Sequence, residues 1–233
     1  MKTALTFGLK TALKASIPTV AFVITLTTSS IAKATSFIPS DIVWLLDTSG
    51  SMGGDINQVK SRIGDFDQAM IDSGIDARYA LVRFGGNETL IQDLTDFSTF
   101  TAPGSSFNLL RANGGGTERG SRAVNVALAN TTFRPGSVKN FILVTDEDDD
   151  SRSSDFNAAS LGLTETDTLF NFIGVPGVGN TDSYYGDLAA NHGGVGFNIN
   201  QFRANPEPFF ENFIDTKVRE IQERYEETKS TPE

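Results

Sequence analysis

The feature of this sequence that most constrains its fold is a short apolar run at residues 42–46, which is followed at once by Asp47, Ser49 and Ser51. A continuous apolar run of this length, bounded by turn residues, is typical of a strand buried on both faces near the centre of a parallel sheet. Open α/β sheets bind ligands just beyond the carboxyl ends of their strands. We therefore expect the carboxylate and the two hydroxyls to share one partner, which we interpret as a metal ion.

Strands and helices alternate along the rest of the chain. Residues 56–70 place apolar side chains three and four positions apart, which is one helical face packed on a sheet. The predicted strands cover residues 41–46, 79–84, 88–94, 141–144, 169–175 and 196–199, and further helices are predicted at residues 106–111, 118–130, 153–161, 182–191 and 208–227. This order predicts an α/β fold, a Rossmann-like, doubly wound and mostly parallel sheet that has one antiparallel edge strand and helices on both faces.

The first 34 residues have the pattern of a signal peptide. They contain four basic and no acidic residues, a short apolar stretch at residues 19–26, and the small residues Ala32 and Ala34 before an expected cleavage site at Thr35. An N-terminal membrane anchor is the alternative, but the apolar stretch falls short of the ~20 residues that a spanning helix needs. We expect an exported protein, either secreted, periplasmic or on the cell surface, with no stable membrane span in the mature chain.

The composition of the remaining chain limits the function further. Residues 35–233 hold 15 basic and 29 acidic residues, a net charge of −14, which argues against nucleic acid as a partner and agrees with cation binding. The chain has no cysteine, so thiol catalysis and zinc–thiolate sites are excluded. We expect one domain at residues 35–227 and a polar tail at residues 228–233.

Two more oxygen-bearing residues are expected at the same edge as Asp47. Thr117 follows the glycines at residues 114–116, and Asp146 follows the predicted strand at residues 141–144. Carboxylate and hydroxyl oxygens are the ligands that hard divalent cations prefer, Mg²⁺ above all, with Mn²⁺ or Ca²⁺ as alternatives. The predicted metal site therefore consists of five residues, Asp47, Ser49, Ser51, Thr117 and Asp146.

These residues resemble the metal-ion-dependent adhesion site (MIDAS) of von Willebrand factor type A (vWA) domains. The family pattern is Asp-x-Ser-x-Ser after the first strand, a Thr about 70 residues on and an Asp about 100 residues on; here the intervals from Asp47 are 70 and 99. The Ile-Gly-Val at residues 173–175 and the segment at residues 188–194 also match the family. The resemblance covers roughly residues 40–225.

The resemblance implies a binding or adhesion module and no enzyme. Ser49 and Ser51 would bind the cation directly, whereas Asp47, Thr117 and Asp146 would bind it directly or through water. A Glu or Asp of a protein ligand, or another ligand carboxylate, would complete the coordination shell. The alternative is a structural envelope or matrix component in which the domain serves assembly without metal-dependent capture.

Two other interpretations of these residues explain less of the pattern. Ser49, Ser51 and Asp146 could each cap a helix, but capping does not explain their convergence. A Ser-His-Asp hydrolase would have to use the single histidine, His192, yet no Gly-x-Ser-x-Gly precedes it, and we expect His192 to be an exposed loop residue.

Two further segments, an acidic run and the C-terminal end, resemble known motifs only weakly. The acidic run at residues 146–150 lacks the glycine and the glutamate of a calcium-binding loop. For residues 148–150 a solvated loop is the simpler interpretation, with tuning of cation affinity as the alternative. The terminal Thr231-Pro232-Glu233 is similar to the start of a sorting signal of some exported bacterial proteins, without its apolar segment or basic tail.

Overall fold

The computed structural model describes residues 37–230. The predicted signal peptide at residues 1–34 and the terminal residues 231–233 lie outside this range, so both predictions stay predictions. Between residues 37 and 230, none of the helices combines the length and the apolar composition that crossing a bilayer requires.

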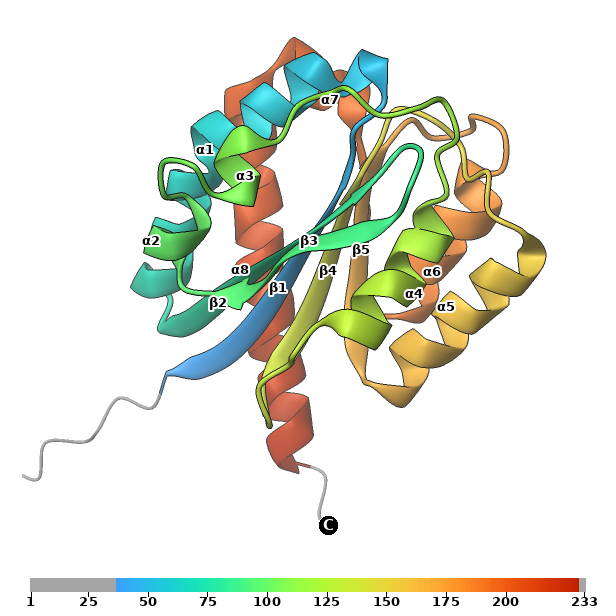
Figure 1. The fold of residues 1–233 in the computed structure, drawn as a ribbon. Helices are drawn as coiled ribbons and strands as arrows, with labels where there is room; N and C mark the ends of the chain where they lie inside the picture. The colour runs from blue at the N-terminus through green and yellow to red at the C-terminus, as the bar shows by residue number, and fades with distance from the viewer. Residues whose placement is uncertain (1–36, 231–233) are drawn as a thin grey trace, which may run out of the picture. The chain divides into compact units, whose positions relative to one another are not determined.

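The described residues form an α/β arrangement with sixteen elements (Figure 1). The strands are β1 (Ile38–Asp47), β2 (Ile75–Phe84), β3 (Thr89–Thr95), β4 (Val138–Val144), β5 (Thr168–Gly174) and β6 (Gly196–Asn198). The helices are η1 (Gly50–Met52), α1 (Gly53–Asp72), α2 (Phe97–Phe100), α3 (Ser106–Leu109), α4 (Gly120–Asn130), α5 (Ser153–Glu165), η2 (Asp182–Gly186), α6 (Asp187–Asn191), α7 (Ile199–Ala204) and α8 (Pro206–Ser230).

The six strands form one sheet in the order β3-β2-β1-β4-β5-β6. All neighbouring pairs are parallel except β2 and β3, so β3 is the antiparallel edge strand that the sequence predicts. In β1, Trp44 lies beside Leu81 of β2 and Ile142 of β4. The predicted fold class, a mostly parallel Rossmann-like sheet, is confirmed.

Both faces of the sheet are covered, as the continuous apolar run at residues 42–46 predicts. Trp44 packs in a cluster with side chains of α1 and α8, whereas its neighbours Val43 and Leu45 pack in a second cluster with side chains of α4 and α5. Figure 1 shows α1 and α8 on one face of the sheet and α4, α5 and α6 on the other. Because strand side chains alternate between faces, a strand buried on both sides must be apolar throughout.

The segment between β3 and α4 is more regular than its sequence suggests. It contains α2 and α3, and each begins with a side chain that accepts a hydrogen bond from the first turn. Asp96 accepts one from Thr99 N at 2.8 Å, and Ser105 accepts one from Asn108 N at 3.1 Å. N-caps of this kind stabilise helix starts that have little apolar pattern of their own.

The C-terminal region departs from the prediction at two points. Ile199 begins α7 rather than ending a strand, because the Asn198 side chain accepts a hydrogen bond from Asn200 N at 2.9 Å and caps a helix there. The closing helix α8 continues to Ser230, so residues 228–230 of the predicted polar tail are helical.

Candidate functional site

Asp47 ends β1 and is completely buried at the carboxyl edge of the sheet. Its Oδ1 accepts a hydrogen bond from Ser49 N at 2.7 Å, and its Oδ2 accepts one from Thr145 Oγ1 at 2.7 Å. Burial raises the pKa of the Asp47 carboxyl, and these two hydrogen bonds counteract part of that rise. The carboxylate is therefore held in one orientation by the loops that follow β1 and β4.

Ser49 and Ser51 connect Asp47 to Asp146. The two serine Oγ atoms lie 3.3 Å apart, and Ser51 Oγ donates a 2.8 Å hydrogen bond to Asp146 Oδ1. Ser49 makes no side-chain capping bond at the start of η1, and α5 begins only at Ser153, well past Asp146. Helix capping therefore does not account for Ser49 or Asp146.

The loop that carries Thr117 is attached to the same edge by backbone hydrogen bonds. Gly114 N donates to the Thr48 carbonyl oxygen at 2.7 Å, and the Thr117 carbonyl oxygen accepts from Gly86 N at 3.0 Å. A Cβ on Gly114 would collide with the Gly85 carbonyl oxygen and with Thr48, so only glycine allows this approach. The Thr117 side chain itself is exposed.

The structure thus brings four of the five predicted residues into one hydrogen-bonded chain, namely Asp47, Ser49, Ser51 and Asp146. Thr117 joins them through the backbone of its loop and makes no side-chain hydrogen bond within the described part of the chain. Its role as a ligand stays a prediction.

An open hollow of about 590 Å³ lies beside these residues. Its lining residues come from the three loops that follow β1, precede α4 and follow β4, and they are Ser49, Gly50, Ser51, Gly114, Gly115, Gly116, Glu118, Glu147, Asp148 and Asp150. The acidic side chains in this lining give the hollow a negative potential, which favours a cation.

Glu118 is a site residue that the sequence analysis missed. Its side chain lines the hollow although the residue is only 6% exposed. Burial, together with the negative charges of Asp47, Asp150 and Glu147, raises the pKa of Glu118 to about 7. The sequence feature that could have indicated a role for Glu118 is its position directly after Thr117 in the glycine-rich loop.

The acidic run after β4 is not a solvated loop throughout. Asp149 is 2% exposed, and it accepts hydrogen bonds from Ser121 N at 3.2 Å, from Ser121 Oγ and from Ser151 N at 2.9 Å. Asp150 Oδ2 accepts a bond from Glu118 N at 3.0 Å. Asp149 therefore anchors the loop to the start of α4, and the expectation of a solvated segment is wrong for Asp149. Asp150 is exposed, as that expectation has it, although its carboxylate accepts a hydrogen bond.

Within residues 37–230, the side chain of one basic residue contacts the candidate site. Arg203, from α7, donates through Nη2 to Asp146 Oδ2 at 2.7 Å. The same guanidinium forms a two-pronged pair with Asp55 in the first turn of α1, at 2.9 Å from Nε and 2.6 Å from Nη2. No sequence motif predicts these contacts. Arg203 is 57 positions from Asp146 and 148 positions from Asp55 in the sequence.

The donor set fits a hard divalent cation. Two carboxylates and two hydroxyls converge beside an acidic hollow, and oxygen ligands of this type suit Mg²⁺ or Mn²⁺. Among residues 37–230, no group of three or more His, Cys, Asp and Glu side chains is arranged to hold a metal, so binding here would depend on the serine hydroxyls.

His192 is not the exposed loop residue that the sequence suggests. It is 7% exposed, its Nε2 lies 3.3 Å from Ser160 Oγ, and burial lowers the pKa of its imidazole. In the described part of the chain no carboxylate hydrogen-bonds to this imidazole, so the Ser160–His192 pair lacks the third member of a hydrolase triad.

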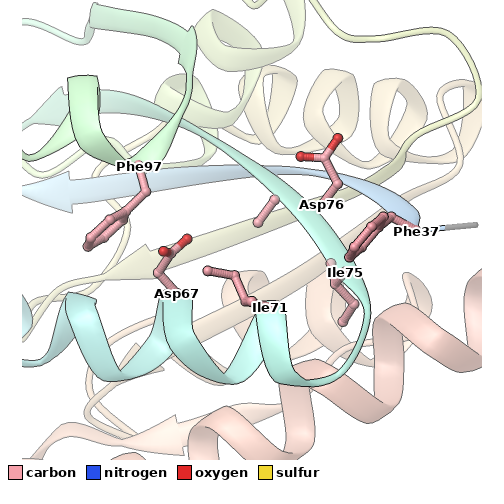
Figure 2. Close-up of a pocket in the computed structure, with 7 residues that line it drawn as sticks. Phe37, Asp67, Ile71, Ile75, Asp76 and Phe97 are labelled. Atoms are coloured by element: carbon pink, nitrogen blue, oxygen red, sulfur yellow. The ribbon is translucent and has the colours of Figure 1, made fainter. Parts of the chain in front are cut away.

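A separate groove lies at the opposite, amino-terminal end of the strands, near the start of β2 (Figure 2). Figure 2 shows the aromatic rings of Phe37 and Phe97 and the side chain of Ile71 around it, with the carboxylates of Asp67 and Asp76. Ile75 pairs with Ile38 at the start of β1, whereas Asp47 pairs with Phe84 at the far end. This groove is therefore not part of the candidate site.

Comparison with known proteins gives the family and the fold. No curated protein matches the chain. Among solved structures, it is similar to a von Willebrand factor type A protein from Catenulispora acidiphila (20% identity, TM-score 0.59, covering 79% of this chain and 43% of that one). It is also similar to proximal thread matrix protein 1 from the mussel byssus, solved with a zinc-occupied MIDAS motif (17%, 0.60, 79% and 46%).

A third similar structure is the conserved hypothetical protein BatB from Bacteroides thetaiotaomicron (15% identity, TM-score 0.57, covering 80% of this chain and 99% of that one). The chain spans less than half the length of the first two structures, and identities this low show the fold alone. A sequence model of the von Willebrand factor type A domain matches residues 41–211, and the chain belongs to that family.

Proposed function

We propose that this protein is a metal-dependent binding module that captures a protein or other carboxylate-bearing ligand at the carboxyl edge of its sheet. The observation that carries the proposal is the 2.8 Å hydrogen bond from Ser51 Oγ to Asp146 Oδ1, which joins the loops after β1 and β4 beside an open acidic hollow. The bond joins loops that lie 95 positions apart in the sequence, and it places Ser49, Ser51 and Asp146 at the same strand edge as Asp47.

The cation would be held by Asp47, Ser49, Ser51, Thr117 and Asp146, with Mg²⁺ as the first choice. Asp47 is fixed by Ser49 N and Thr145, so its buried charge already favours a cation before any ion arrives. Once bound, the ion would supply a positive centre that accepts a carboxylate oxygen of the ligand. The hollow beside Ser49 and Ser51 leaves room for that carboxylate.

Binding rather than catalysis is part of the proposal. It is supported by the position of His192, which lies against Ser160 and does not line the acidic hollow. Export to the cell surface, the periplasm or the medium is also proposed, and it rests on the sequence of residues 1–34.

The test is a titration of the protein with MgCl₂ and MnCl₂, followed by calorimetry and by thermal unfolding. Binding to the native state stabilises it by RT ln(1 + [L]/Kd), which is about 2.7 kcal/mol at 100 times Kd. Ser51→Ala should abolish most of this shift, because it removes a predicted ligand whose side chain is exposed. Ser61→Ala is the matched control, since Ser61 bonds only to the Gln58 carbonyl on the exposed side of α1. No shift in the unmodified protein up to millimolar metal would refute the proposal.

The competing function is an assembly component that needs no metal. It predicts self-association that persists in chelator and is unchanged by Ser51→Ala. Sedimentation with and without chelator separates the two functions.

A further inference from the structure

The Asp146 carboxylate has a partner on each oxygen. Ser51 Oγ donates to Oδ1 at 2.8 Å, and Arg203 Nη2 donates to Oδ2 at 2.7 Å. Ser51 belongs to the predicted metal site, but Arg203 lies in α7, far along the chain. A carboxylate expected to face a divalent cation is thus already paired with a monovalent cation of the protein itself.

The Arg203 side chain is held beside Asp146 by an ion pair with Asp55. Nε and Nη2 of its guanidinium pair with both oxygens of Asp55, whose side chain is 3% exposed, while the Arg203 side chain is 37% exposed. A planar guanidinium that is paired on two sides with carboxylates has a fixed orientation, and a guanidinium stays charged at any physiological pH. The charge beside Asp146 is therefore permanent.

A fixed positive charge at this place has two opposite effects. In the metal-free protein it offsets the repulsion among Asp47, Asp55 and Asp146, which lie at neighbouring ends of β1, α1 and β4. When a divalent cation approaches Asp146, the same charge repels it and competes for the same carboxylate.

We propose that Arg203 is a built-in counter-cation that competes with the divalent metal for Asp146 and sets the metal affinity of the site. This inference rests on the proposed function. By linkage, whatever displaces α7 and its Arg203 strengthens metal binding, and bound metal weakens the hold of Arg203 on Asp146 by the same factor. Arg203 is a positioning residue here and not a ligand.

The experiment is a calorimetric Mg²⁺ titration of the unmodified protein, Arg203→Gln and Arg203→Lys, with thermal unfolding of each in chelator. Arg203→Gln should bind Mg²⁺ at least about fivefold more tightly, the lower end of a typical coupling between sites. Its melting temperature in chelator should fall, because the carboxylates lose their counter-charge. Arg203→Lys keeps the charge but cannot pair with Asp55 and Asp146 in the same way, so its Mg²⁺ affinity should lie between those of the unmodified protein and Arg203→Gln. If the Gln variant does not fold, Arg203→Lys that binds Mg²⁺ no more tightly than the unmodified protein would overturn the inference.

Arg78→Gln is the matched control for net charge. Arg78 pairs with Asp76 and Asp96 near the start of β2, at the opposite end of the strands, and should leave the Mg²⁺ affinity unchanged. Equal or weaker Mg²⁺ binding by Arg203→Gln, in a protein that does bind Mg²⁺, would overturn the inference and leave the proposed function intact. Absence of Mg²⁺ binding in the unmodified protein would refute both.

Discussion

Oδ2 of Asp47 accepts a 2.7 Å hydrogen bond from Thr145 Oγ1, although the two residues are 98 positions apart. Both are fully buried, so this bond satisfies a carboxylate oxygen that water does not reach. It also fixes the end of β1 relative to the loop after β4, and the candidate site is built across these two strand ends. The hydroxyl of Thr145 therefore supports the site without being one of its predicted ligands.

Thr145→Val should destabilise the protein by about 1.5–3 kcal/mol, because it removes a hydrogen bond to a buried charged group at nearly constant volume. Urea unfolding at neutral pH measures this difference. Thr164→Val is the control: Thr164 lies exposed on α5 and bonds only to the Ser160 carbonyl, so its replacement should cost less than about 0.5 kcal/mol. Equal costs for the two variants would show that the Thr145–Asp47 bond contributes no stability.

The glycine-rich loop offers a matched pair of substitutions. A Cβ at Gly114 would meet the Gly85 carbonyl oxygen and Thr48 Oγ1, whereas a Cβ at Gly116 would have nothing within 4 Å. Gly114→Ala should therefore cost more than about 1 kcal/mol and move Thr117 away from Asp47, while Gly116→Ala should be neutral within about 0.5 kcal/mol. Thermal unfolding measures both costs, and a Mg²⁺ titration of each variant measures the displacement of Thr117. If the two alanines behave alike, the close approach of the loop to Thr48 is not required.

Asp149 gives a test of whether the acidic run is structural. It is buried and accepts bonds from Ser121 and Ser151, so Asp149→Ala leaves these donors without an acceptor and should cost about 2–4 kcal/mol. Glu147 is exposed in the same run, and Glu147→Ala should change stability by less than about 0.5 kcal/mol. Denaturant unfolding of the two variants decides the matter. A cost below 1 kcal/mol at Asp149 would restore the picture of a solvated loop.

The regular parts of the fold were predictable because local patterns determine them. The apolar run at residues 42–46 and the spacing from Ile56 to Met70 predict a central strand and a packed helix, and both are present. The order of such elements was enough to predict a parallel sheet with β3 as an antiparallel edge. Short elements such as α2 and α7 escaped prediction, because a single capping side chain rather than a periodic pattern starts them.

The site was predictable only in part, for a physical reason. Asp47, Ser49 and Ser51 lie within one turn, and their spacing alone indicates a shared partner. Arg203 could not be found in this way, because its contacts depend on how α7 packs against α1 and on the end of β4. The burial of Glu118 likewise follows from the approach of three loops, which no spacing in the sequence records.

The buried ammonium group of Lys217 should make the stability of the protein rise with pH in the alkaline range. Lys217 is fully buried on α8, its Nζ lies 2.6 Å from Glu220 Oε2 and 5.3 and 5.7 Å from the ring centroids of Phe197 and Phe213, and burial lowers the pKa of its ammonium group from 10.5 to about 8. Between pH 8 and 10.5 the unfolded chain binds more protons at Lys217 than the folded one, so the contribution of this residue to stability rises with pH across that window. The cost at neutral pH is roughly 3 kcal/mol at most, since one pKa unit corresponds to about 1.4 kcal/mol.

The measurement is urea unfolding at pH 7, 8, 9 and 10 for the unmodified protein and for the double variant Lys217→Met/Glu220→Gln, which removes both charges together. At pH 7 the double variant should be at least as stable as the unmodified protein, because it removes both charges of a buried pair and with them the cost of taking each charge out of water. As the pH rises from 8 to 10, the unmodified protein should gain stability relative to the variant, by about 1–2 kcal/mol. Parallel curves for the two proteins would show that Lys217 titrates at its ordinary pKa. A curve that falls relative to the variant would show that the attraction of Glu220 outweighs burial and raises the pKa of Lys217.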